Sequence, residues 1–383
     1  MKPTVKLASL FLAVLMLFSV FASGCTLNKE WSYKTKDKTL AIGVYLTAMY
    51  ECYLEAQNYA SKLDDYDASS SKWLDLEITD DEGNTAVAKD WIKENTERKC
   101  LELLAIEAEL KKMDATVDEA TVDRYAESME NYWYQGLKKT LEPKGVSLES
   151  FKYYTSRYTV EYEKLFDLFY GEEGTKRPGK DEITKYFEQN YIEYAYLPVA
   201  LTATSDEAAT GKVALSEAEA NKVTTAVDAV KETVNKSADA AAADEAFAAA
   251  IAEYMSANGL TEDSLTTATS VQKKVNTGTD ELDEALKTLE EGKAVTLKVG
   301  EADSAQYYCV YRYSTAKAKT DYLTEDGAND SEVIKEMKTK EYREYLAGVI
   351  KDIGYEKSKY VGKYQPSMFF EKPKNTGTSV ITG

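Results

Sequence analysis

The first 25 residues constrain this chain most, because they decide the compartment in which the rest of it folds. Lys2 and Lys6 precede an apolar run over residues 7–22, and two small residues at 23–24 lead into Cys25. A basic start, an apolar centre and small residues before a cysteine are typical of a secretory signal that ends in a lipobox. The run has about 16 residues, whereas a helix that spans a membrane needs roughly 20.

We therefore predict a lipoprotein signal peptide over residues 1–24 and a lipid on the Cys25 thiol. The chain is then expected outside the cytoplasm, anchored by that lipid to the bacterial cell membrane. Two alternatives are an ordinary signal peptide with an incidental cysteine and an anchor that is not cleaved.

Charge and composition exclude several classes of function. The formal net charge of −19 argues against nucleic acid as a partner, because phosphate binding needs clustered Lys and Arg. The chain has 0 histidines, which removes His-based catalytic triads, His metal ligands and an imidazole general base. No twelve-residue calcium-loop motif is present in the sequence, and we expect neither a cofactor nor a metal.

The chain has three further cysteines, Cys52, Cys100 and Cys309. No two of them form a C-x-x-C motif, so the sequence gives no support for a zinc site or for thioredoxin-like chemistry. Cys52 and Cys100 lie in apolar helical segments. They are either joined by a disulfide or are small buried hydrophobic residues, which is the commoner fate of an isolated cysteine.

Hydrophobic periodicity predicts an α+β fold that is mostly helical. From residue 37 to about 179, apolar residues recur at spacings of three and four, as in packed helices. The middle of the chain combines strand and helix signals, with a capping pattern at Ser216–Glu219 and a polar, loop-like stretch after Thr261. The predicted elements are a strand at 191–202, helices at 216–235, 239–256 and 280–290, strands at 295–299 and 306–313, and a helix at 331–353. Residues 25–36 are expected to be a tether and residues 373–383 a disordered tail.

Three segments of the middle region resemble parvulin-type prolyl isomerase domains. Residues 181–190 (DEITKYFEQN) are similar to the lead-in of such domains, and residues 243–254 (ADEAFAAAIAEY) to their Asp-Phe-Ala-x-x-Ala-x-x-Tyr helix. Residues 281–293, followed by the strand at 307–312, are similar to the closing third of the family. With helical segments on both sides, the order of the pieces resembles the PrsA-like foldase lipoproteins and the related chaperone SurA.

This resemblance implies a domain plan and a function. Residues 181–316 are expected to form a parvulin-like domain, and residues 317–372 to return to an N-terminal helical module at 37–180. In that plan the terminal segments form the module that holds peptides, so the expected partners are unfolded or newly exported proteins. The oligomeric state and the identity of the clients stay open.

The chain departs from the parvulin pattern at the positions that carry catalysis. Tyr196 stands where the first strand of a parvulin usually carries a histidine, and Tyr308 where the last strand does. The Gly-Gly-Asp-Leu-Gly turn of the family is replaced by residues 266–279, and the insertion at 204–236 is longer than expected. We therefore interpret Tyr196 and Tyr308 as a degenerate isomerase cleft with no catalytic residues.

The hypothesis is a chaperone or foldase with an inactive isomerase-like domain. The alternatives are an active peptidyl-prolyl isomerase and a surface lipoprotein that binds a solute or has a structural role. Tyrosine is abundant, with 29 Tyr against 10 Phe and 4 Trp, and its amphipathic ring suits peptide contact. The candidate client-binding residues are Tyr132, Trp133, Tyr153, Tyr154, Phe166 and Phe169. The alternative for these six is that they form the core of the helical module, as aromatic residues at helical spacing usually do.

Overall fold

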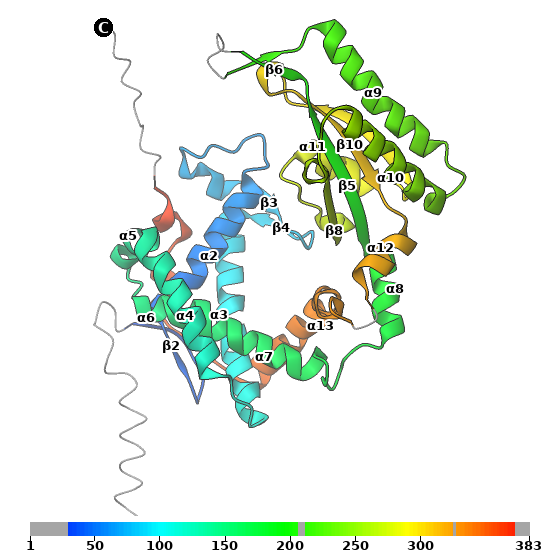
Figure 1. The fold of residues 1–383 in the computed structure, drawn as a ribbon. Coiled ribbons are helices and arrows are strands. Elements are labelled where there is room, and N and C mark those ends of the chain that lie inside the picture. The colour runs from blue at the N-terminus through cyan, green and yellow to red at the C-terminus, as the bar shows by residue number, and fades with distance from the viewer. Residues whose placement is uncertain (1–29, 206–210, 325–326, 372–383) are drawn as a thin grey trace, which may run out of the picture. The chain divides into compact units, whose positions relative to one another are not determined.

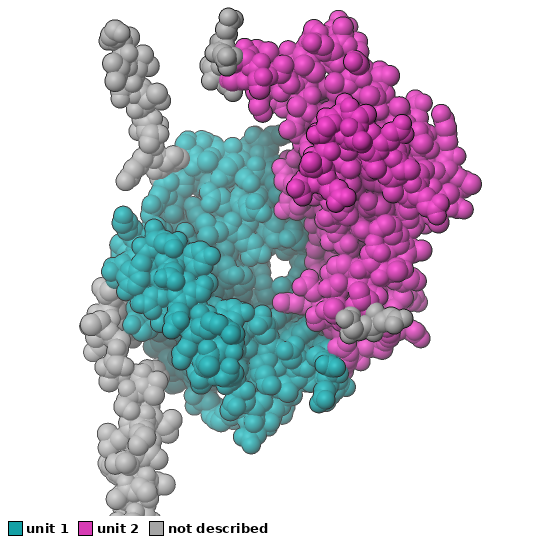
Figure 2. Space-filling model, in the orientation of Figure 1, with its two compact units in different colours: residues 1–175, 339–383 teal, residues 176–338 magenta. Residues whose placement is uncertain are grey.

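The computed structural model describes residues 30–205, 211–324 and 327–371. The predicted signal peptide, Cys25 and the predicted tail at 373–383 lie outside the described residues. The fold is α+β and mostly helical, as predicted (Figure 1). The chain divides into two compact units: unit 1 contains residues 1–175 and 339–383, and unit 2 contains residues 176–338 (Figure 2).

Unit 1 is built mainly from helices. Its helices are α2 (Ile42–Ala60), α3 (Ala88–Lys112), α4 (Glu119–Tyr132), α5 (Lys138–Leu141), α6 (Leu148–Lys152), α7 (Tyr158–Tyr170) and the later turns of α13 (Asp330–Ile353). Its strands are β1 (Trp31–Lys34), β2 (Thr39–Ala41), β3 (Glu77–Thr79), β4 (Thr85–Val87) and β11 (Glu356–Lys357).

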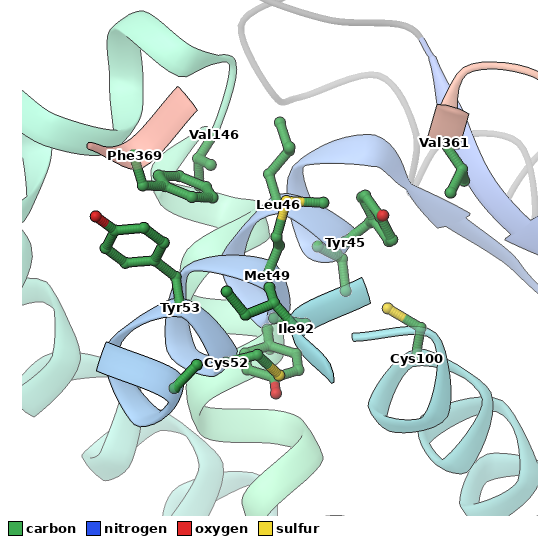
Figure 3. Close-up of a cluster of buried hydrophobic side chains, with 14 of the residues drawn as sticks. Tyr45, Leu46, Met49, Cys52, Tyr53, Ile92, Cys100, Val146, Val361 and Phe369 are labelled. Atoms are coloured by element: carbon green, nitrogen blue, oxygen red, sulfur yellow. The ribbon is translucent and has the colours of Figure 1, made fainter. Parts of the chain in front are cut away.

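The core of unit 1 surrounds α2. Every residue from 42 to 49 is buried, so this part of α2 is covered on all sides rather than along one stripe. Residues from α3 and from the end of the chain, Val361 and Phe369 among them, pack against it in one cluster (Figure 3). Cys52 and Cys100 are free and buried in this cluster, so the second of the two alternatives for these cysteines holds.

The predicted tether is wrong for residues 31–34. They form β1, the central strand of a small antiparallel sheet in the order β11-β1-β2. Tyr33 pairs with Lys357 of β11, and its ring is fully buried. The strand forms because its pairing partner comes from the far end of the chain, and no local periodicity reports such a partner.

Helix α13 carries the end of the chain into unit 1. Its Tyr342 is 0% exposed and its ring meets four rings of α7, those of Tyr162, Phe166, Phe169 and Tyr170. The ring centroid of Tyr342 lies 5.0 Å from that of Tyr162, 5.3 Å from that of Phe166 and 6.3 Å from that of Phe169. Residues far apart in sequence therefore share one aromatic core.

Unit 2 is an antiparallel four-stranded sheet with helices on both faces. Its strands are β5 (Tyr191–Ala200), β6 (Thr202–Thr204), β7 (Lys212–Ala214), β8 (Thr266–Val271), β9 (Lys293–Val299) and β10 (Gln306–Arg312). Its helices are α8 (Lys180–Asn190), α9 (Glu217–Asn235), α10 (Ala240–Ala257), α11 (Asp280–Thr288), α12 (Thr315–Tyr322) and the first turns of α13.

The sheet order is β8-β5-β10-β9, with β6 and β7 forming a separate hairpin. Side chains alternate between its two faces, as in any strand. One face, with Leu197 and Cys309, packs against α9 and α10. The opposite face, with Ile192 and Val310, packs against α11.

Most predicted elements of unit 2 are confirmed within a few residues of their expected ends. The capping pattern at the start of α9 is also confirmed, because the Ser216 hydroxyl and the Glu219 carboxylate each accept from the other's backbone N–H. The polar loop predicted after Thr261 is wrong over residues 266–271, which form β8. Among the strands that the structure describes, β8 pairs with β5 alone. Its Thr and Ser side chains therefore remain exposed or part-exposed, and its sequence lacks the apolar alternation that usually predicts a strand.

Candidate functional site

Tyr196 and Tyr308 lie side by side on the face of the unit 2 sheet that packs against α11. β10 pairs with β5 so that Tyr308 is opposite Pro198 and Val310 is opposite Tyr196. The two tyrosines are thus diagonal neighbours on the central strands, with ring centroids 6.2 Å apart and ring planes tilted by 54°. Tyr194 stacks beside Tyr196 at 6.4 Å, which extends the pair into a row of three rings.

The chemistry of this row is limited to contact and hydrogen bonding. The Tyr308 hydroxyl donates to Oε1 of Gln306 at 2.5 Å. Burial, and then the neighbouring Tyr196, raises the pKa of Tyr308 above its ordinary value, so its phenol is neutral near pH 7. Prolyl isomerisation breaks no bond and must overcome about 18–20 kcal/mol of amide rotation. A row of phenol rings can hold a peptide but offers no imidazole to such a reaction.

The six aromatic residues predicted to bind clients in unit 1 separate into two groups. Trp133, Tyr154, Phe166 and Phe169 are buried in the core, as the alternative interpretation expected. Tyr153 is half-buried. Tyr132 is 56% exposed and is the member of the set that presents most of its ring to solvent.

Tyr134 is a neighbouring exposed residue that the sequence reasoning missed. It is 60% exposed, and together with Tyr132 it flanks Trp133, which is only 1% exposed. Trp133 points inward and packs against Phe151, with ring centroids 5.3 Å apart. A single π-helical turn over Trp133–Leu137 begins at this point, and such turns recur at functional sites. The signal that could have identified the outward pair is helical spacing, because Val122, Ala126, Met129 and Trp133 recur at intervals of four, three and four along the buried face.

Five buried or half-buried tyrosines of unit 1 have a structural role that sequence reasoning also missed. Their hydroxyls donate to carboxylates of neighbouring helices, so that phenols supply the donors which a chain without histidine lacks. The pairs are Tyr153 with Glu107, Tyr154 with Glu51, Tyr158 with Glu102 at 3.3 Å, Tyr170 with Glu341 at 3.0 Å, and Tyr345 with Glu109. These bonds join α7, α13 and the segment at 153–154 to α2 and α3.

Glu161 is the carboxylate of unit 1 whose ionisation is most altered by its surroundings. Burial, and then the charge of Glu107, raises the pKa of Glu161 to about 7. Arg157, whose Nη1 lies 3.2 Å from Glu161 Oε1, and Lys38 oppose this rise. The group belongs to the packing of α7 against α3 and lies apart from the exposed aromatic pair in sequence.

Within the described ranges, no group of three or more acidic or cysteine side chains is arranged to hold a metal ion. Among the helices of residues 30–371 that the structure describes, none combines the length and the apolar composition that crossing a bilayer requires. The candidate site residues are the row of Tyr194, Tyr196 and Tyr308 in unit 2 and the exposed pair Tyr132 and Tyr134 in unit 1.

No family model and no curated protein matches this chain. Among solved structures, it is similar to the foldase protein PrsA from Lactococcus lactis, with 15% identity, a TM-score of 0.31 and coverage of 89% of this chain and 98% of that chain. It is also similar to the foldase protein PrsA from Streptococcus pneumoniae, with 14% identity, a TM-score of 0.30 and coverage of 75% and 97%. TM-scores of 0.31 and 0.30 are low, so neither likeness assigns a function to this chain.

Proposed function

We propose that this chain is an extracytoplasmic, lipid-anchored chaperone of the foldase type, which holds unfolded or newly exported polypeptides. The observation that carries the proposal is the division of the chain. Both of its ends, residues 1–175 and 339–383, contribute to unit 1, while residues 176–338 fold as unit 2 around their own sheet. This is the plan that the resemblance to PrsA-like lipoproteins implies, with a peptide-holding module from the terminal segments and a parvulin-like domain between them.

The exposed pair Tyr132 and Tyr134 is the surface that we assign to client contact. A chaperone must accept many sequences, and tyrosine rings contact peptide groups and side chains of many kinds without strict geometry. The two rings lie at a π-helical turn whose Gly136 has open space around it. The buried candidate Trp133 packs against Phe151 beneath this turn and does not itself touch a client.

Unit 2 is proposed to be a parvulin-like domain without isomerase activity. The order of its elements, a strand, two helices, a strand, a helix and two strands around one antiparallel sheet, supports this assignment. The neighbouring positions of Tyr196 and Tyr308 on its central strands support the idea that these tyrosines stand where the family's histidines would. Without those imidazoles, the row is expected to bind weakly and not to accelerate amide rotation.

Anchoring and location are proposed from Cys25 and the segment before it. Expression of the full chain with Cys25→Ser should move the protein from the membrane fraction to the soluble extracytoplasmic fraction. Retention of the Cys25→Ser protein in the membrane fraction would instead support an uncleaved anchor.

The function is tested by the aggregation of chemically unfolded clients, followed by light scattering. The purified mature protein should suppress aggregation at a near-stoichiometric ratio, and Tyr132→Ala combined with Tyr134→Ala should remove most of that effect. Met113→Ala is the matched control, since Met113 is another exposed apolar residue of unit 1 and lies outside the pair. Suppression that is absent for every client, or that is equal in the double variant and the wild type, would contradict the proposal.

Isomerase activity is tested separately by refolding of a protein whose slow phase is limited by proline isomerisation. Because uncatalysed isomerisation takes about 10–100 s at 25 °C, a catalyst is easily detected. We expect an unchanged rate even at a high concentration of this chain, with an active parvulin as the positive control. An acceleration that Tyr308→Ala abolishes would support the alternative of an active isomerase.

A further inference from the structure

Strand β8 leaves one edge of the unit 2 sheet open for pairing. It is the terminal strand of the order β8-β5-β10-β9 and has β5 as its strand neighbour. Its sequence, TTATSV, contains no charged residue and no proline, which are features that usually protect an edge strand from pairing. The opposite edge, β9, carries Lys293 and Lys298. The two edges of one sheet are therefore protected unequally.

The β8 segment is close to a palindrome about Ala268. If two β8 strands from two copies pair antiparallel with Ala268 opposite Ala268, then Thr267 is opposite Thr269 and Thr266 is opposite Ser270. In the same register Leu265 is opposite Val271. Pairs of Thr with Thr or Ser, and apolar pairs on one face, are among the cross-strand pairs that stabilise antiparallel sheets. In this register the two residues of each pair are both even-numbered or both odd-numbered, so their side chains lie on the same face of the joined sheet.

The charges beside β8 follow the same symmetry. Glu262 and Asp263 lie just before the strand, and Lys273 and Lys274 just after it. Both pairs lie in short 3-10 turns, Glu262–Ser264 and Gln272–Lys274, so a two-fold axis through Ala268 brings the acidic end of each strand beside the basic end of the other without a fixed residue pairing. Among the described residues, the side chains of Asp263 and Lys273 are exposed and make no ion pair or hydrogen bond, whereas Lys274 bonds Glu336 of its own chain at 2.6 Å. An extended client of arbitrary sequence would not require this arrangement.

We propose that the β8 edge binds the β8 edge of a second copy of this chain, joining two unit 2 sheets into one antiparallel sheet with two-fold symmetry. The interface is isologous, because the same patch is used by both copies. The main-chain N–H and C=O groups of the two edges supply its hydrogen bonds, and the opposite charges at the two ends favour the antiparallel orientation. An interface of six residues on each side is small, so the dimer is expected to be weak and to form at high local concentration.

Cysteine cross-linking tests the register. In the proposed dimer the two Ala268 Cβ atoms are directly opposite each other at about 4.5–5.5 Å, near the range in which a disulfide forms. The full chain with Ala268→Cys should therefore form a covalent dimer on mild oxidation. Thr266→Cys is the matched control on the same strand, because its two copies would lie about 14 Å apart along the strand direction. The wild-type chain, with Cys52, Cys100 and Cys309 buried, sets the background from Cys25.

Charge reversal tests the partner independently of cross-linking, by sedimentation of the mature chain over a range of concentrations. Asp263→Lys and Lys273→Asp should each weaken dimerisation about tenfold, since each change brings like charges together at both ends of the two-fold interface. The double variant should restore the wild-type constant. Cross-linking that is as efficient from Thr266→Cys as from Ala268→Cys, a double variant that stays weak, or a chain that stays monomeric at all concentrations would overturn the proposal. So would a β8 edge that cross-links to a client segment and never to a second copy.

Discussion

Replacement of Tyr342 by alanine tests whether the last helix of the chain is an integral part of unit 1. The Tyr342 side chain extends from α13 into a pocket formed by rings of α7, among them Tyr162, Phe166 and Phe169. It is fully buried, and its hydroxyl donates to the Tyr162 carbonyl oxygen at 3.4 Å. The substitution removes the ring and leaves a cavity between two helices that are distant in sequence.

The expected loss in the free energy of unfolding follows from the removal of a buried aromatic side chain. Truncation of a core Phe or Trp to alanine costs about 3–5 kcal/mol, and Tyr342 has the same degree of burial. For a domain of 150–250 residues, each 1 kcal/mol shifts the melting temperature by roughly 2–4 °C. We therefore expect Tyr342→Ala to lower the melting temperature of unit 1 by about 10 °C.

Tryptophan fluorescence reports this change from unit 1 alone. The 4 tryptophans of the chain, Trp31, Trp73, Trp91 and Trp133, all precede residue 175, so unit 2 contributes no tryptophan signal. Urea unfolding followed at tryptophan wavelengths therefore gives the free energy of unfolding of unit 1 without separation of the two units.

Tyr342→Phe is the matched control, because it keeps the ring and removes only the hydroxyl. Its expected cost is about 1 kcal/mol, the usual net value of one hydrogen bond. If Tyr342→Ala were within about 1 kcal/mol of the wild type, the packing of α13 in unit 1 would not matter for stability and the reasoning would be refuted.

Two further predictions concern ionisation. Because burial and Glu107 raise the pKa of Glu161 to about 7 in the folded state, the stability that protonated Glu161 contributes is complete below its unfolded pKa and is lost as pH rises through about 7. Glu161→Gln should therefore gain stability relative to the wild type between pH 5 and pH 8, by up to about 3 kcal/mol in urea unfolding, and an unchanged difference would contradict the assignment. Burial raises the pKa of Cys52 to about 11 and that of Cys309 to about 12, and it raises the pKa of Cys100 as well. These three thiols should resist alkylation at pH 8 until denaturant is added, and rapid native labelling of any of them would show that it is accessible.

The elements that sequence predicted well are those whose signal is local. Helix α9 begins at a capping pattern and continues through residues that favour helix, so its start at Glu217 could be expected from a few neighbouring residues. Strand β10, QYYCVYR, is the central strand beside β5 and carries the aromatic and β-branched residues that favour a buried strand.

The elements that sequence missed depend on distant partners. Strand β1 exists because β2 and β11 pair with it, and β11 lies more than three hundred residues away in the chain. Strand β8 is polar because it lies at an edge, so its composition resembles a loop. A local pattern contains no information on either kind of pairing.

The candidate site was predictable only in part. The neighbouring positions of Tyr196 and Tyr308 follow from strand register, and the resemblance to parvulin domains led to both residues. In unit 1, Trp133 continues the buried stripe of α4, in which Val122, Ala126 and Met129 recur at spacings of four and three, so helical spacing favours Tyr132 and Tyr134 as the outward residues.

Photo-cross-linking from the exposed aromatic pair tests the central claim most directly. A photoreactive phenylalanine analogue in place of Tyr134 should cross-link to an unfolded client, and addition of the same client in folded form should not give the product. The same analogue in place of Tyr355, which is 43% exposed on the same unit, is the control and should give little product. Equal cross-linking from both positions, or cross-linking from neither while aggregation is still suppressed, would contradict the account that this chain holds its clients at Tyr132 and Tyr134.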